Sequence, residues 1–169
     1  QLVLACCNSG VVGSFPALNQ RDSSGFRAWL EEIQAGLHSD AAPYAVNLIV
    51  HHSNPRLQDD LAICVEKRVP IIITSLGAVK EVVDAVHSYG GLVFHDVTTR
   101  RHAEKAAEDG VDGLIAVAAG AGGHAGVTSP FALVQEIRQW FQGPLALSGS
   151  IATGDAVLGG LALLALGLG

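Results

Sequence analysis

The chain has 169 residues, of which 49% are hydrophobic and only 15% are charged. This composition excludes an intrinsically disordered protein, which combines low hydrophobicity with high charge, and the length allows one domain with a substantial core. The formal net charge is −6 and the lysines and arginines form no long run. The sequence therefore lacks the basic surface that nucleic-acid binding requires, and we expect no nucleic-acid partner.

The cysteines and the two ends of the chain bear on its location. Cys6, Cys7 and Cys64 are odd in number and lack CxxC spacing, so a disulfide framework is not expected and a reducing, cytoplasmic location is favoured. The apolar segment 156–169 is shorter than the about 20 residues that a transmembrane helix needs, so no membrane association is expected. Because the sequence begins with Gln1 and contains no methionine, we expect it to be part of a longer protein.

Strand-like and helical segments alternate along the chain. Residues 2–7 predict the end of a helix, which Asn8-Ser9-Gly10 closes. Six short apolar runs then predict strands, and their lack of polar alternation favours parallel strands that are covered on both faces. The predicted strands are residues 11–15, 45–50, 70–75, 92–97, 113–118 and 144–148.

Apolar residues at intervals of three and four predict amphipathic helices between these strands. Gly90 and Gly110 follow two helical segments at positions typical of a C-cap. Asn54-Pro55 and Ser129-Pro130 each place a proline directly after a residue that commonly caps a helix. The apolar faces of three of these predicted helices consist of Phe26, Leu30, Ile33 and Leu37; of Leu57, Leu61 and Cys64; and of Val79, Val82, Val83 and Val86.

One helix followed by six strand–helix units predicts an α/β fold, either a doubly wound sheet or part of a (β/α)8 TIM barrel. A barrel needs eight strands, and one strand before Gln1 and one after Gly169 would complete it. We therefore expect a single domain over residues 1–169 that is an incomplete barrel, without its first and last strands.

The most specific local pattern is the glycine-rich segment 120–126, Gly-Ala-Gly-Gly-His-Ala-Gly, directly after the fifth predicted strand. In a barrel, functional residues lie at the carboxyl ends of the strands. Glycine allows a positive φ or close approach to a flat ligand, and His124 can accept or donate a proton near neutral pH. The alternative interpretation is a flexible loop with an incidental surface histidine.

A second pattern is the turn Ser148-Gly149-Ser150 between the sixth predicted strand and a helix. Backbone N–H groups at such a helix start can bind a phosphate, and this late position is the common phosphate site of TIM barrels. An ordinary turn capped by serine or threonine would have the same sequence.

Several polar residues lie in or directly after apolar strands. Asn47, inside a predicted strand, could bind the edge of a ligand or tie two strands together. His51 and His52 are adjacent and on an extended strand would face opposite ways, as would His95 and Asp96. No metal site is therefore predicted.

These segments, in this order, resemble the nitronate monooxygenase family, flavin enzymes once called 2-nitropropane dioxygenases. The resemblance runs across nearly the whole chain. Its most specific element is Ala-Gly-Gly-His-Ala-Gly at 121–126, whereas the turn at 148–152 is shared with many FMN and phosphate-binding barrels. The other matching stretches are residues 45–50, 70–77, 93–98, 101–103 and 110–115.

The resemblance implies an FMN-dependent oxidoreductase that uses O2 to oxidise nitronates or nitroalkanes to a carbonyl compound and nitrite. It implies that His124 lies by the flavin ring, where it takes the α-proton of a nitroalkane or stabilises the nitronate anion. The redox chemistry would belong to the cofactor, and the protein would position and polarise the substrate.

The resemblance also implies a set of cofactor contacts. Gly149 and Ser150, which follow Ser148, would hold the FMN phosphate through their backbone. Glycines would let the loop before His124 pass close to the cofactor. Asn47 would contact FMN, and Ser75 would line the mouth of the same site. In chain order, the implied cofactor-binding residues are Asn47, Ser75, Gly122, Gly123, Ser148, Gly149 and Ser150.

The sequence departs from the family pattern at Asp96 and at its ends. Family members often have a lysine that helps to bind FMN where this chain has Asp96, and a carboxylate does not favour an anionic phosphate. The N-terminal strand with its Ala-Pro-Met turn and the eighth strand with its Gly-Thr-Arg-Phe-like turn are absent. An unclosed barrel would expose strand edges and tend to aggregate or form a homodimer.

Two other functions fit the same pattern. One is a flavin reductase that passes hydride from NAD(P)H through FMN to a quinone or an enoyl thioester, on the same barrel. The other is a degenerate barrel that binds a phosphate ligand without catalysis, which Asp96 favours and an intact His124 disfavours.

Overall fold

The computed structural model describes residues 1–77, 79–123 and 126–165. The chain divides into two compact units, Gln1–Val93 and Phe94–Gly169.

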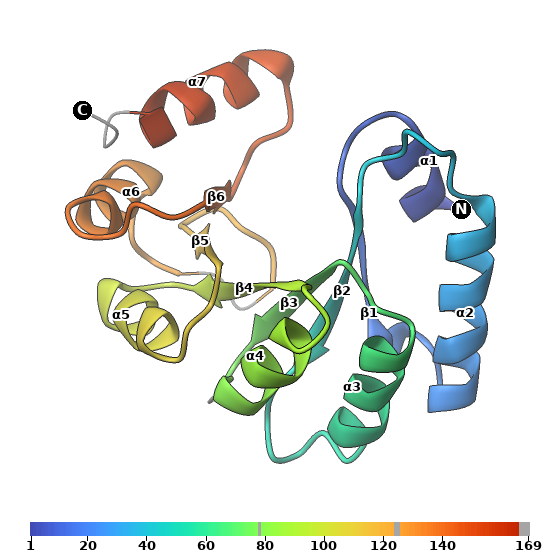
Figure 1. The fold of residues 1–169 in the computed structure, drawn as a ribbon. Coiled ribbons are helices and arrows are strands. Elements are labelled where there is room, and N and C mark those ends of the chain that lie inside the picture. Colours follow the sequence, from blue (N-terminus) through green and yellow to red (C-terminus); the bar gives the residue numbers. More distant parts are fainter. Residues whose placement is uncertain (78, 124–125, 166–169) are drawn as a thin grey trace. The chain divides into compact units, whose positions relative to one another are not determined.

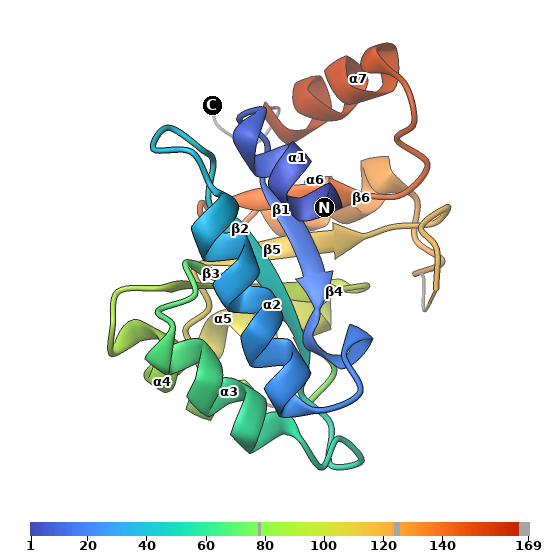
Figure 2. The same ribbon diagram turned by 90° about the vertical axis from the view of Figure 1, so that its right-hand side faces the viewer.

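The first unit consists of parallel strands covered by helices. Strands β1, β2 and β3 are neighbours in chain order and run parallel. Helices α2, α3 and α4 lie side by side along one face of these strands (Figure 1, Figure 2). The elements are α1 (Leu2–Asn8), β1 (Gly13–Pro16), η1 (Ala17–Asn19), α2 (Ser23–Gly36), β2 (Tyr44–Ile49), α3 (Leu57–Glu66), β3 (Ile71–Ser75) and α4 (Lys80–His87).

The amphipathic stripe of α2 illustrates why these helices form. Phe26, Leu30 and Ile33 are buried, and the ring of Phe26 lies 6.1 Å from that of Phe15 on β1. The helix begins where the Asp22 side chain accepts a hydrogen bond from a backbone N–H of the first turn. Apolar spacing and a capping residue together therefore place α2 against the strands.

The second unit repeats the pattern. Strands β4, β5 and β6 are parallel neighbours in chain order. The side chains of Thr99 and Ser129 cap α5 and α6, each accepting a hydrogen bond from the first turn. The elements are β4 (Leu92–Val97), which begins at the end of the first unit, α5 (Arg100–Glu108), β5 (Gly113–Val117), α6 (Pro130–Arg138), β6 (Leu145–Ser148) and α7 (Gly154–Ala165).

All six predicted strands are confirmed, with bounds that agree to within two residues. The cap predicted at Ser129 is confirmed, whereas the one predicted at Asn54 is wrong. Helix α3 begins only at Leu57, and the Asn54 side chain instead accepts a hydrogen bond from the Arg56 N–H, two residues along the chain. Asparagine competes for such local bonds, so an Asn-Pro pair can form a turn in front of the helix instead of its cap.

The strands have one buried and one partly exposed face. Because side chains alternate along a strand, Thr74 and His95 point to the buried, helix-covered face of their units. Asn47, Ser75 and Asp96 belong to the other face and are half-buried. Because of this alternation, some polar residues of the strands pack beneath the helices, whereas others lie on the face that a ligand could reach.

None of the helices within the described residues is long and apolar enough to cross a membrane.

Candidate functional site

Asn47 and Ser75 meet at the carboxyl ends of β2 and β3. The Asn47 Nδ2 donates a hydrogen bond of 3.1 Å to the Ser75 Oγ, and both side chains are half-buried on the partly exposed face. The amide therefore ties the two strands together, as one of the two sequence interpretations predicted. The same amide also has an oxygen that can accept a hydrogen bond from a ligand.

The turns that follow β2 and β3 pack against each other next to this pair. The Val50 N–H donates to the Ser75 carbonyl at 2.9 Å. Gly77 has a φ of +84°, and a Cβ at this position would overlap the Val50 carbonyl oxygen. Only glycine satisfies both conditions, since other residues avoid positive φ. Sequence analysis did not single out Gly77 as a functional residue, although it ends one of the segments that resemble the family.

A cavity of about 380 Å³ lies in the first unit between the turn after β2 and the first turn of α3. Its polar lining includes His51, Asn54 and Gln58, and Val50 and Gly77 form part of its wall. The cavity thus adjoins the strand ends that present Asn47 and Ser75.

The two histidines beside this cavity lie on the same side of the chain. The rings of His51 and His52 are 4.0 Å apart between centroids. The expectation that they face opposite ways is wrong, because β2 ends at Ile49 and both residues lie in the turn that follows. The Ser53 N–H donates to the His51 Nδ1 at 3.2 Å, so a neutral His51 carries its proton on Nε2 and is a hydrogen-bond donor there.

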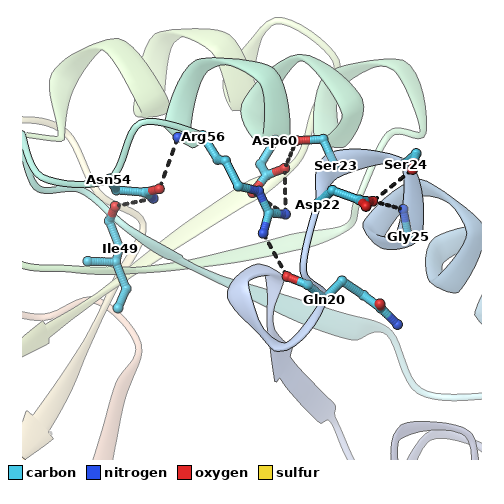
Figure 3. A network of polar contacts seen from close by, with 9 residues as sticks. All are labelled: Gln20, Asp22, Ser23, Ser24, Gly25, Ile49, Asn54, Arg56 and Asp60. Carbon is cyan, nitrogen blue, oxygen red and sulfur yellow. Dashed lines mark hydrogen bonds and ion pairs between the residues drawn. The ribbon is translucent and has the colours of Figure 1, made fainter.

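A buried ion pair anchors the helix on the far side of the cavity (Figure 3). The Arg56 Nη2 lies 3.0 Å from the Oδ2 of Asp60, which is fully buried. Ser23 donates to the Asp60 Oδ1 at 2.7 Å, and the Arg56 Nη1 donates to the Gln20 carbonyl at 2.7 Å. These contacts join the segment after β1 to the start of α3. Sequence analysis missed this pair, whose only signal was the i, i+4 spacing of opposite charges.

In the second unit, the turn after β6 adopts an unusual backbone. Gly149 has a φ of +142° and Ser150 a φ of +54°. Four residues after Gly149, Thr153 accepts a hydrogen bond from the Ala156 N–H at 3.2 Å, at the start of α7. Successive residues in such conformations can turn several N–H groups towards one point, which is the geometry that binds anions.

The glycine-rich loop after β5 lies against this turn. The Ser150 Oγ donates to the Gly120 carbonyl at 3.1 Å. Gly123 has a φ of +70°, and a Cβ on Gly122 or Gly123 would meet no described atom within 4 Å. Packing therefore does not demand glycine at position 122. His124, the predicted catalytic residue, lies outside the described residues.

The neighbours His95 and Asp96 diverge, as predicted for a strand. His95 is buried beneath α5, and this burial lowers its pKa to about 4. Asp96 is half-buried on the opposite face, where it pairs in register with Ile115 of β5. The two side chains therefore lie on opposite faces of β4. No group of three or more metal-ligating side chains occurs in the part of the chain that the structure describes.

Parallel strands in chain order, each followed by a helix, with polar turns at their carboxyl ends, define an α/β protein of the (β/α)8 barrel class. Six barrel strands lie within the described residues. FabK from Thermotoga maritima matches 96% of this chain with a TM-score of 0.85 at 25% identity. A nitroalkane oxidase from Streptomyces ansochromogenes also matches 96%, with a TM-score of 0.84 at 18% identity.

The profile of the nitronate monooxygenase family matches residues 20–168, and the chain belongs to this family. A nitronate monooxygenase of Neurospora crassa is 35% identical over 101 residues, which cover 54% of this chain and 27% of that protein. The chain spans 50% of FabK and 58% of the nitroalkane oxidase. It thus corresponds to about half of the solved structures and to a smaller share of the curated relative.

Proposed function

We propose that this chain is the barrel domain, residues 1–169, of an FMN-dependent oxidoreductase that uses O2 to oxidise nitronates or nitroalkanes to a carbonyl compound and nitrite. The observation that carries the proposal is the Gly149-Ser150 turn in front of α7, in a chain whose family profile spans residues 20–168.

The Gly149-Ser150 turn fits a phosphate group bound through the backbone. The Ser150 hydroxyl is already bonded to the Gly120 carbonyl, so the N–H groups of the turn would hold the phosphate. The nearby start of α7 adds the positive end of a helix dipole. Ser148 would contribute as the last residue of β6.

Asn47 fits the edge of a flavin ring, which carries both carbonyl and N–H groups, and Ser75 would line the mouth of the same site. They are half-buried on the partly exposed face of β2 and β3, where a flat ligand could lie against the strands. Gly122 and Gly123 have open space where a side chain would be, which supports close approach of a cofactor.

FMN, when bound, supplies the electron acceptor, and the protein supplies position and proton transfer. His124 would take the α-proton of a nitroalkane or stabilise the nitronate anion.

The first experiment is a visible absorbance spectrum of the purified full-length protein, with identification of the chromophore it releases. Bound FMN and nitronate oxidation that requires O2 but not NADH are expected. Turnover that depends on NAD(P)H would support the flavin reductase instead. No flavin, even after FMN is added, would refute the cofactor assignment and support a degenerate barrel.

The variant His124→Ala tests the catalytic assignment. We expect it to keep its flavin spectrum and to lose at least about 100-fold in kcat with nitroalkanes, the usual contribution of a general base. His38→Ala, in the loop after α2, is the matched control and is expected to turn over normally. Unchanged turnover of His124→Ala would remove this residue from the mechanism.

A further inference from the structure

A side-chain hydrogen bond joins two backbone positions with positive φ in the second unit. Ser150, with a φ of +54°, donates from its Oγ to the carbonyl of Gly120, which has a φ of +91°. Serine is disfavoured in the left-handed region, and glycine would adopt it more readily. A glycine at position 150, however, would have no hydroxyl to make this bond.

The contact extends over three consecutive residues of each segment. The Ala118 N–H donates to the Ser148 carbonyl at 2.9 Å. A Cβ on Gly149 would lie 3.1 Å from the Ala119 carbonyl oxygen, so the two backbones approach closely there. A Cβ on Gly120 would overlap the Ser150 Oγ. The turn after β6 and the loop after β5 therefore fit together in this way only with glycine at position 120.

The first part of the glycine-rich loop is held at further points. The Ala119 N–H donates to the Thr128 carbonyl at 2.8 Å. This bond joins the residues on either side of the glycine-rich loop, just beyond the end of β5. A Cβ on Gly126 would lie 2.6 Å from the Val117 carbonyl oxygen and 3.2 Å from the Thr98 Cβ. The Ser150 hydroxyl thus adds a side-chain contact to a loop whose base is already fixed by backbone contacts.

We infer that Ser150 is a positioning residue, whose hydroxyl holds the Gly120 carbonyl and thereby fixes the start of the glycine-rich loop against the turn that would bind the FMN phosphate. This inference rests on the proposed function, because the phosphate is assigned to that turn there. The side chain of Ser150 acts through Gly120, and only the backbone of Ser150 would contact the cofactor.

The variant Ser150→Gly separates this role from a purely structural one. It removes the hydroxyl but relieves the disfavoured backbone conformation, so the melting temperature of the apoprotein is expected to stay level or rise. The dissociation constant for FMN, measured by quenching of FMN fluorescence in full-length apoprotein, is expected to rise about five- to tenfold, the loss typical of one hydrogen bond. Ser150→Asn, which tolerates positive φ and can donate, should restore part of the affinity.

Ser88→Ala is the matched control. Ser88 also donates from its hydroxyl to a backbone carbonyl, that of Ala85 at 2.7 Å, but at the end of α4. This variant should leave the FMN dissociation constant unchanged. An unchanged dissociation constant for Ser150→Gly as well, in a protein whose wild type binds FMN, would overturn the positioning role alone. Wild-type protein that takes up no FMN would overturn the proposed function and this inference together.

A double-mutant cycle tests the contact itself. Gly120→Ala introduces a Cβ that overlaps the Ser150 Oγ in the wild type but not in a Ser150→Gly background. The cost of alanine at a φ of +91° is present in both backgrounds and cancels in the cycle. We expect Gly120→Ala to weaken FMN binding less in the Ser150→Gly background, and strictly additive effects would contradict the contact.

Discussion

Arg56 and Asp60 form an ion pair one helical turn apart, with the guanidinium 18% exposed and the carboxylate 1% exposed. The pair joins the first turn of α3 to the segment after β1 through Gln20 and Ser23. It thus holds in place the helix that forms one side of the cavity beside His51.

Removal of one partner of this pair should destabilise the protein strongly. Asp60→Ala leaves the half-buried Arg56 without its carboxylate, and the free energy of unfolding is expected to fall by about 3 kcal/mol. Glu104→Ala breaks the exposed pair with Arg100, which has the same spacing, and should cost less than about 1 kcal/mol. Urea unfolding of both variants gives the comparison, and equal losses would contradict the importance of burial.

The joint replacement Arg56→Met with Asp60→Leu should recover much of the loss caused by Asp60→Ala. Apolar residues of similar size avoid the cost of burying charge, although the bonds to Gln20 and Ser23 are lost. A double variant as unstable as Asp60→Ala would indicate that these two hydrogen bonds, and not the ion pair, provide the stability.

The melting temperature should fall when alanine replaces Gly77 but not when alanine replaces Gly122. Gly77→Ala places a Cβ against the Val50 carbonyl at a φ of +84°, so the melting temperature should fall by several degrees. Gly122→Ala meets open space and should leave the melting temperature of the apoprotein unchanged, while it weakens FMN binding if the cofactor passes there. Gly122→Ala with unchanged FMN affinity would place the cofactor away from this residue.

The two interpretations of Asn47 can be separated by a comparison with Ser75. If Asn47 binds the flavin edge, Asn47→Ala should weaken FMN binding about tenfold, whereas Ser75→Ala removes the interstrand bond with a smaller effect on FMN. If the amide only ties β2 to β3, both variants should lower the melting temperature alike and leave FMN binding unchanged. Asn19→Ala, at the exposed end of η1, is the control.

His95 should make the protein sensitive to acid. Burial lowers its pKa from 6.5 to about 4, against a raising effect of Asp109 and smaller lowering effects of His102 and Lys105. Between these pH values the unfolded chain binds a proton that the folded protein does not, so the stability that is present above pH 6.5 is lost as the pH falls towards 4. The loss is on the order of 3 kcal/mol.

The variant His95→Phe isolates this contribution. Its side chain is apolar and does not titrate, so the free energy of unfolding should depend less on pH than that of the wild type between pH 6.5 and 4. Urea unfolding at several pH values measures the difference. Identical pH dependence in both proteins would show that His95 titrates normally in the folded state.

The strands, the helices and the class of the fold could be predicted from the sequence alone. Stripes such as Phe26, Leu30 and Ile33 reflect the burial of one face of an element, which recurs at regular positions and so leaves a repeated signal. The family could also be recognised from local segments, because the glycine-rich loop and the Ser/Gly turn are each continuous in the chain.

Which polar residues meet could be known only from the folded structure. His51 and His52 could be placed on one side only once the end of β2 was known, and Asn54 could be assigned to a turn only once α3 was seen to begin at Leu57. The bond between Ser150 and Gly120 joins residues 30 positions apart. Such single contacts depend on the register of neighbouring strands and on individual φ angles, and neither leaves a periodic pattern in the sequence.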